Sequence, residues 1–274
     1  MNPQDPDVER RFGGVRRLHG DGALETLAQA RVTVVGLGGV GSWAAEALAR
    51  CGIGAMTLVD LDHVAESNIN RQIHALENTL GKAKIQAMAD RILAINPHCK
   101  LTLIDDFLTP DNVAQILADR PTAVIDCTDQ VAAKIAMILH ARDTDLPLIL
   151  CGGAGGKTDP LALRAGDLSE ALNDALLAKI RTRLRREHGY GRASTPGGKP
   201  LKRVPKMKVR TLWVDQPVRL PSLWQTDAPT TATTEDGEAL QGLSCAGYGS
   251  IVTVTASMGL AAAHEVLSLL FQNP

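Results

Sequence analysis

Short, mainly apolar runs alternate with longer amphipathic stretches through the first half of the chain. The apolar runs lie at residues 32–35, 55–59, 101–104, 123–126 and 146–150. Runs of this length that are rich in β-branched and aliphatic residues predict buried strands. Strands that alternate with helical patterns predict an α/β fold. We therefore expect a Rossmann-like, mostly parallel sheet with helices on both faces.

The segments between these runs carry the helical pattern. We predict helices over 42–50, 80–94 and 130–142 from the spacing of their apolar residues. Another helix is expected to begin at Thr109, since threonine caps helix starts and Pro110 fits the first helical position.

The last apolar segment, 249–271, is interrupted only by His264 and Glu265 as ionisable residues. Its length suits a membrane span. However, it is rich in small and hydroxyl residues and begins with the strand-like run 251–255. We therefore expect a strand followed by a buried helix packed on the sheet, and no membrane span. Residues 1–11 are polar and charged, which predicts no signal peptide.

The amino-acid composition indicates the kind of core and the cellular compartment of the protein. Hydrophobic residues make up 45% of the 274 residues but aromatic residues only 3%, so the core should be mostly aliphatic. The five cysteines form no Cys-x-x-Cys pair, which indicates reduced thiols in a cytoplasmic protein without a structural zinc site. The net charge of −1 would by itself argue against a nucleic-acid partner.

That average conceals a basic segment. From Lys179 to Arg210 there are twelve Lys or Arg and one acid, Glu187. A solvated loop is the alternative explanation, but so large an imbalance favours a polyanion such as an RNA or DNA backbone. The candidate RNA-binding residues are Arg181, Arg183, Arg185, Arg186, Lys202, Arg203, Lys206 and Lys208.

A glycine pattern follows the first predicted strand. Gly36, Gly38 and Gly41 form Gly-x-Gly-x-x-Gly, with Gly39 inside it. Without a Cβ the backbone can approach a phosphate closely, and the N-terminus of the next helix favours its negative charge. Asp60 ends the second strand, where its carboxylate can accept hydrogen bonds from ribose hydroxyls. The sequence therefore predicts a nucleotide site.

Further charged residues follow at the carboxyl ends of the strands, where open α/β sheets bind ligands. Asp62 and Arg71 come after the second strand, and Arg71 can pair with a carboxylate or fork onto a phosphate. Lys84, or its neighbour Lys82, can reach the phosphates from the start of a helix. Asp129 is a candidate Mg²⁺ ligand, since Mg²⁺ at nucleotides takes one or two carboxylates plus phosphate oxygens.

Five motifs together resemble those of the E1-like adenylating enzymes, which include the activators of sulfur-carrier and ubiquitin-like proteins. The motifs are Gly36-x-Gly-Gly-x-Gly41, Asp60-x-Asp62, Ser67-Asn-x-Asn-Arg71-Gln72, Gly81-x-x-Lys84 and Asp126-x-x-Asp129, and the resemblance covers about residues 10–155. It implies ATP and Mg²⁺ as cofactors. It also implies that ATP is bound by Gly36, Gly38, Gly39, Gly41, Asp60 on the ribose, Asp62, Asn70, Arg71, Lys84 and Asp126, and Mg²⁺ by Asp129. From the residues alone, Asp126 could equally cap its own turn.

The resemblance further implies a homodimer in which an N-terminal arginine reaches the partner's ATP. Arg11 is the first candidate for this catalytic arginine and Arg17 the second. The chain then divides into an N-terminal helical arm (1–30), an ATP-binding core (31–156), and a basic substrate-binding insert with a C-terminal strand and helix that complete the same fold (157–274).

Additional stretches resemble one branch of this family. They include Arg11-Phe-Gly-Gly14, Asn70-Arg-Gln-Ile-His-Ala75, Cys151-Gly-Gly-Ala-Gly-Gly156 and Cys245-Ala-x-x-Gly249. This branch carries out a ligase-type reaction, the ATP-dependent dehydration of N6-threonylcarbamoyladenosine next to the tRNA anticodon. The resemblance implies such a tRNA as partner, no DNA, and a cysteine desulfurase as a possible assistant. Residues 199–238 depart from the branch. Cys245 is the cysteine most worth testing, with a structural role favoured over catalysis.

Two alternative functions share part of this pattern. An adenylyltransferase that activates the C-terminal Gly-Gly of a sulfur-carrier protein would use the same ATP residues but would not need the basic segment. An NAD-dependent oxidoreductase or a non-catalytic Rossmann module would leave Arg71, Lys84 and Asp129 unexplained.

Overall fold

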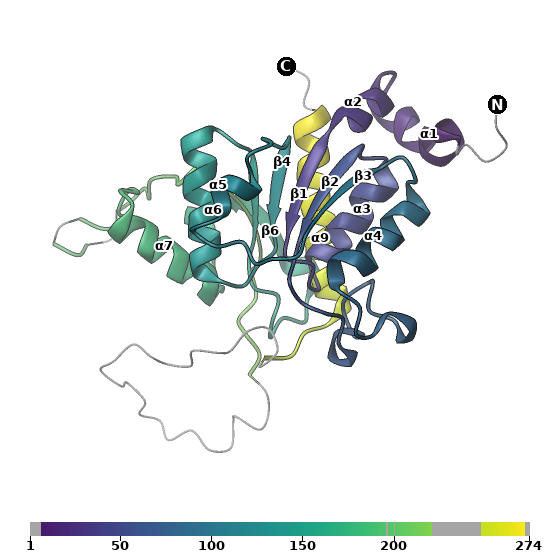
Figure 1. The fold of residues 1–274 in the computed structure, drawn as a ribbon. Helices are drawn as coiled ribbons and strands as arrows, with labels where there is room; N and C mark the ends of the chain where they lie inside the picture. The colour runs from purple at the N-terminus through teal and green to yellow at the C-terminus, as the bar shows by residue number, and fades with distance from the viewer. Residues whose placement is uncertain (1–6, 196, 200, 221–247, 272–274) are drawn as a thin grey trace.

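The computed structural model describes residues 7–195, 197–199, 201–220 and 248–271 (Figure 1). Its centre is a seven-stranded sheet in the order β3-β2-β1-β4-β5-β7-β6. The strands are β1 (Arg31–Val35), β2 (Ala55–Val59), β3 (Lys100–Ile104), β4 (Ala123–Asp126), β5 (Leu148–Cys151), β6 (Leu163–Asp167) and β7 (Arg210–Val214). Only β6, at one edge, is antiparallel to its neighbour. The predicted α/β fold with a mostly parallel sheet is confirmed.

Helices cover both faces of the sheet, as Figure 1 shows. The α-helices of the described residues are α1 (Val8–His19), α2 (Ala23–Gln29), α3 (Gly41–Cys51), α4 (Lys84–Ile95), α5 (Val113–Ile116), α6 (Val131–Thr144), α7 (Ala175–Glu187) and α9 (Val252–Phe271). Alternate residues along each strand enter different cores. Val32 and Val34 of β1 pack with α3, α4 and α9, whereas Val35 lies in the cluster formed with α5, α6 and α7.

The five predicted strands are all present, but two further strands join the sheet after residue 157. β6 and β7 form its far edge, and α7 connects them. The basic segment therefore begins on α7 and ends at Arg210, the first residue of β7. Strands of one sheet come from both sides of residue 156, and the division of the chain at that point stays a prediction.

The expected strand at 251–255 is wrong, because residues 252–255 form the first turn of α9. Val254 and Thr255 are buried there, and a Cβ placed on Gly39 would lie 3.1 Å from Thr255 Cγ2. Packing of this turn against the glycine turn overrides the strand preference of β-branched residues.

The predicted helix start at Thr109 is also wrong, since α5 begins at Val113. The Asn112 side chain accepts a hydrogen bond from the Thr109 amide and donates one to Phe107 O. This side chain holds the preceding residues in a turn and delays the helix.

α9 is the one helix in the described part of the chain that is long and apolar enough to cross a membrane. Buried core helices meet the same criteria, and Val254, Met258, Ala262 and Val266 lie in the core beside α3. The predicted buried helix packed on the sheet is confirmed.

Candidate nucleotide-binding site

The glycine turn lies where the strand order reverses. β1 has β2 on one side and β4 on the other, and the usual ligand position in such sheets, which we call the nucleotide crevice, lies beyond the carboxyl ends of these strands. Gly36 has a φ of +86°, and its amide donates to Val59 O. A Cβ on Gly41 would lie 1.9 Å from Gly36 O. This turn therefore requires glycine at both positions.

The middle of the turn is open. A Cβ on Gly38 would meet no heavy atom within 4 Å. The amides of Gly38, Gly39, Val40 and Gly41 donate no hydrogen bond to any described residue. Free amides at the start of an eleven-residue helix can bind an anion, and a phosphate at this turn stays the prediction from the sequence.

Asp60 ties two loops of the crevice together. Its Oδ2 accepts a hydrogen bond from the Leu37 amide at 2.6 Å, and its Oδ1 accepts one from the Asp62 amide at 2.8 Å. Burial raises the pKa of Asp60, while Lys84 and the two amides oppose that rise. The carboxylate thus fixes the turn after β1 against the loop after β2, and its contact with a ribose stays a prediction.

Lys84 completes this charged cluster. It is the first residue of α4 and is buried, with Nζ 2.7 Å from Asp62 Oδ2 and 4.0 Å from Asp60 Oδ1. Lys82 is more exposed and pairs with Asp90 instead. Of the two candidate lysines, the structure therefore brings Lys84 to the crevice.

Arg71 lies across the glycine turn. Its Nη1 donates to Ser67 O at 2.8 Å and to Asn70 Oδ1 at 2.9 Å. A Cβ on Gly39 would lie 3.1 Å from Arg71 Cγ. Trp43 Nε1 donates to Arg71 O, and Asn70 Nδ2 donates to Ser250 O. Sequence reasoning missed Trp43 and Ser250, and an indole in the first turn of the helix after the glycines is the only signal that pointed to either.

Asp129 is exposed just beyond β4, and Asp126 is fully buried at the end of that strand. Asp126 Oδ1 lies 3.2 Å from Lys134 Nζ, and both side chains are 0% exposed. The same oxygen accepts hydrogen bonds from the Thr128 amide and hydroxyl. Asp126 therefore shapes the turn that presents Asp129, and its own contact with a nucleotide stays a prediction.

Sequence reasoning also missed Lys134, although a lone lysine in the apolar run of α6 was a usable signal. Its ammonium donates to Cys151 O at 2.7 Å and so links β4 to β5 below the crevice.

A magnesium ion would have one protein carboxylate here. Among the described residues no three His, Cys, Asp or Glu side chains form a metal-ligating group. Asp129 alone suits Mg²⁺ bound mainly through phosphate oxygens and water.

The N-terminal arginines lie at the other end of the sheet. α1 covers the amino ends of the strands, where Val8 and Phe12 share a hollow with Arg31, Ala55 and Lys100. There Arg11 Nη1 donates to Ile95 O at 2.7 Å. Arg11 therefore lies away from the crevice of its own chain, and contact with a partner's ATP, by it or by Arg17, stays a prediction.

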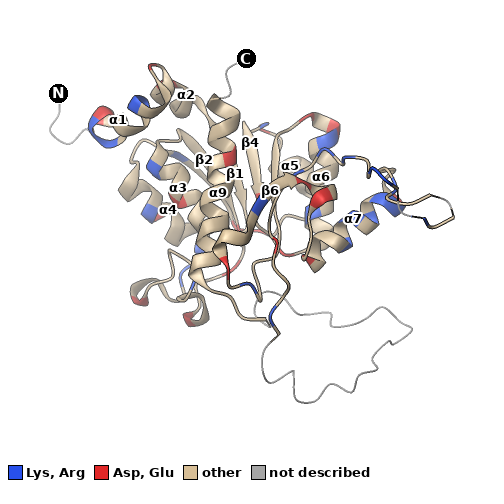
Figure 2. Ribbon diagram, turned by 180° about the vertical axis from the view of Figure 1, so that it is seen from behind, with Lys and Arg blue, Asp and Glu red and all other residues tan. Residues whose placement is uncertain are grey.

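The candidate RNA-binding cations are spread over α7 and the segment after it (Figure 2). Arg183 and Arg186 pair with Glu187, and Lys206 pairs with Glu170. Arg181 is partly buried and donates to Ala171 O. The remaining members are Arg185, which is partly buried, and Lys202, Arg203 and Lys208, which are exposed. Cys245 lies outside the described residues.

Comparison with known proteins identifies the family of the chain and its similar relatives. Residues 14–274 match the ThiF family. The chain is 43% identical to the tRNA threonylcarbamoyladenosine dehydratase of Escherichia coli K12, over 94% of this chain and 92% of that protein. It is similar to the crystal structure of the E. coli tRNA N6-threonylcarbamoyladenosine dehydratase in complex with ATP, with a TM-score of 0.80, 40% identity, and coverage of 96% and 94%.

Similarity to an adenylyltransferase is shorter. The molybdopterin-synthase adenylyltransferase of E. coli K12 is 36% identical over 125 residues, which are 46% of this chain and 50% of that protein. The similarity to the dehydratase thus spans the basic segment as well as the ATP crevice, whereas similarity to the adenylyltransferase covers about half of the chain.

Proposed function

This chain belongs to the ThiF family, and we propose that it dehydrates N6-threonylcarbamoyladenosine next to the anticodon of tRNA, using ATP. The observation that carries the proposal is the extent of similarity to the E. coli dehydratase, 94% of the chain. An adenylyltransferase for a carrier protein remains the more distant alternative.

The reaction begins with a carboxylate, which is a poor electrophile. A carboxylate oxygen of the threonylcarbamoyl group attacks a phosphorus of ATP, and pyrophosphate or ADP departs. The neighbouring ureido group then attacks the activated carboxyl carbon and closes a five-membered ring. AMP or phosphate leaves with the carboxylate oxygen, so the nucleoside loses one water overall. Because this attack is intramolecular, its effective molarity supplies much of the rate and no protein nucleophile is needed.

The protein contributes mainly charge and position. The free amides after Gly36 hold phosphate oxygens, and Lys84 and Arg71 stabilise the negative charge that develops on the leaving group. Lys84 is suited to this role because it is buried and already fixed by Asp62. Because the Lys84 ammonium is already held in place before the reaction, it need not reorient as charge develops on the leaving group.

We further infer that Asp129 holds Mg²⁺ together with the phosphates, where the ion would neutralise charge on the departing oxygens. A homodimer that brings Arg11 to the partner's ATP, a cytoplasmic location, and assistance from a cysteine desulfurase also belong to this proposal. The free thiols of Cys51, Cys99, Cys127 and Cys151 agree with a reducing compartment.

The proposal is tested against its alternative in one experiment. Wild-type protein with ATP and Mg²⁺ is incubated either with tRNA that carries threonylcarbamoyladenosine or with a carrier protein ending in Gly-Gly. Nucleosides are analysed by mass spectrometry and ATP–pyrophosphate exchange is followed in parallel. We expect loss of one water from the modified nucleoside only. Exchange stimulated by the carrier protein, with an unchanged nucleoside, would replace the dehydratase by the adenylyltransferase.

A further inference from the structure

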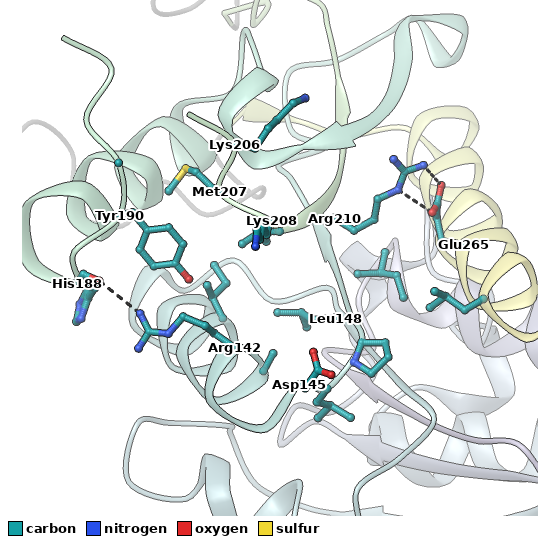
Figure 3. A pocket seen from close by; sticks show the side chains of 18 of the residues that line it. Arg142, Asp145, Leu148, His188, Tyr190, Lys206, Met207, Lys208, Arg210 and Glu265 are labelled. Atoms are coloured by element: carbon teal, nitrogen blue, oxygen red, sulfur yellow. Dashed lines mark hydrogen bonds and ion pairs between the residues drawn. The ribbon is translucent and has the colours of Figure 1, made fainter. Parts of the chain in front are cut away.

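A second groove lies at the end of the sheet opposite the nucleotide crevice. Its volume is about 1030 Å³, and it is walled by α6, residues 188–191 after α7, residues 206–210 and the end of α9 (Figure 3). Leu148 and Arg210, the first residues of β5 and β7, line it. The groove therefore opens at the amino ends of these strands.

Most of the charges at the groove are already paired. Arg210 forms a two-pronged ion pair with Glu265, with both distances 2.8 Å, and Lys206 pairs with Glu170 outside the lining. Lys208 forms no ion pair with any described residue and is exposed. Asp145 is the remaining lining acid. Arg142 pairs with Asp143 outside the lining. Lys208 is thus the lining lysine without an ion-pair partner among the described residues, and its ammonium can contact a negatively charged group of a ligand.

Lys208 also has an unusual backbone. Its φ is +56°, a left-handed conformation that is strained for a residue with a Cβ. The amides of Met207 and Val209, on either side, both donate to the Asp167 carboxylate, and both side chains are buried. The fold therefore holds the chain in a conformation suited to glycine or asparagine, yet a lysine occupies it and faces the groove (Figure 3).

A planar surface lines the same groove as this lysine. Arg142 of α6 has its Cζ 5.7 Å from the centroid of the Tyr190 ring, and its Nη1 donates to His188 O. Burial raises the pKa of Tyr190, and the nearby Arg142 opposes that rise. A tyrosine ring held in place by an arginine is a platform on which a nucleobase can stack.

We propose that this groove binds a stretch of the tRNA substrate, with a base stacked on Tyr190 and Arg142 and a phosphate on Lys208. The inference rests on the proposed function and adds a contact away from the reacting nucleoside. RNA is favoured over a free nucleotide because the basic segment 179–210 forms one wall. The strands between groove and crevice have four or five residues, roughly 15 Å, so one RNA molecule can span both.

Lys208→Gly gives the sharpest test, because it removes the ammonium and relieves the backbone strain together. We expect an equal or higher melting temperature and weaker tRNA binding. The slope of log Kd against the logarithm of the salt concentration should fall by about 0.7–0.9, the change expected for one lost phosphate contact. Lys100→Ala removes one exposed charge at the other edge of the sheet and should leave tRNA affinity unchanged.

Tyr190 tests the stacking separately. Tyr190→Ala should weaken tRNA binding about tenfold or more, whereas Tyr190→Phe keeps the ring and should stay within about twofold. ATP affinity, measured on the same samples, should not change in any of these variants, which shows that the crevice remains folded.

The outcomes separate this proposal from the proposed function. Unchanged tRNA binding by both Lys208→Gly and Tyr190→Ala would overturn the groove as an RNA site. Normal tRNA binding in both variants, with a second AMP site in the wild-type protein that Tyr190→Ala abolishes, would overturn it in favour of a free nucleotide. Weakened tRNA binding in both variants supports the groove even if the wild-type protein fails to dehydrate the nucleoside, a result that would remove only the proposed function.

Discussion

The glycine turn yields a prediction in which stability and ligand affinity change in opposite directions. Alanine at Gly38 adds a Cβ that meets no protein atom within 4 Å. Gly38 is not among the glycines with positive φ. Gly→Ala at such a position raises the free energy of unfolding by about 0.4–1 kcal/mol, because alanine lowers the conformational entropy of the unfolded chain. The folded protein should therefore be as stable as the wild type or slightly more stable.

The same methyl group should impair ATP binding. It would stand in the open space of the cradle, where a phosphate is expected to approach the free amides. Loss of one hydrogen bond to a charged group is worth about 1.5–3 kcal/mol. The Kd for ATP should rise roughly tenfold to a hundredfold.

Gly41→Ala is the contrasting variant. Its Cβ would lie 1.9 Å from Gly36 O, a backbone atom that cannot move away without opening the turn. We expect a loss of at least about 3 kcal/mol in the free energy of unfolding, at the upper end of overpacking effects.

Urea unfolding and calorimetric titration with ATP measure both quantities on the same samples. Wild-type ATP affinity in Gly38→Ala would refute the placement of the phosphates over this turn. A large loss of stability in Gly38→Ala would refute the geometry of the turn itself.

Three further predictions concern the buried groups around the site. Lys134→Met should lower the free energy of unfolding by about 3–5 kcal/mol, because it leaves the Asp126 carboxylate buried and unpaired. In urea titrations the double variant Lys134→Met/Asp126→Asn should recover part of that loss. A loss under about 1 kcal/mol in Lys134→Met alone would contradict the pairing. Burial lowers the pKa of His74 from 6.5 to about 4, so the unfolded chain binds a proton in this range that the folded chain does not. His74 should therefore lower the free energy of unfolding by about 3 kcal/mol as the pH drops through that range, and His74→Gln should make the free energy of unfolding less dependent on pH. The same pH dependence in wild type and His74→Gln would exclude His74 as its cause. Lys84→Met should reduce ATP-dependent turnover about a hundredfold or more. Lys82→Met removes an exposed ion pair and should change turnover little. Equal turnover rates for the two variants would place the phosphates away from Lys84.

Much of the nucleotide site could be predicted because its signals are local. A β-branched run, a glycine triplet and an acid at the next strand end specify the crevice within thirty residues or so. The pairing of Lys84 with Asp62 joins the loop after β2 to the start of α4, and the sequence already placed Asp62 after a strand and Lys84 at the start of a helix.

The remaining features depend on contacts distant in sequence. β6 reads Leu-Arg-Ala-Gly-Asp and is a partly exposed edge strand, so no apolar run marks it. β7 reads Arg-Thr-Leu-Trp-Val and has a clear signal, but it stands at the end of the basic segment that attracted the functional interpretation. The run Val252–Thr255 favours a strand locally, and only its packing against Gly39 and α3 makes it helical.

The central claim is that the substrate carboxylate is activated by ATP, and an isotope measurement tests it most directly. Threonylcarbamoyladenosine in tRNA is labelled with heavy oxygen in its carboxylate and converted by the wild-type protein with unlabelled ATP. We predict that one heavy oxygen appears in the AMP or phosphate released, because ring closure expels the activated oxygen with the phosphorus group. Heavy oxygen found only in water, with none in AMP or phosphate, would contradict activation by ATP.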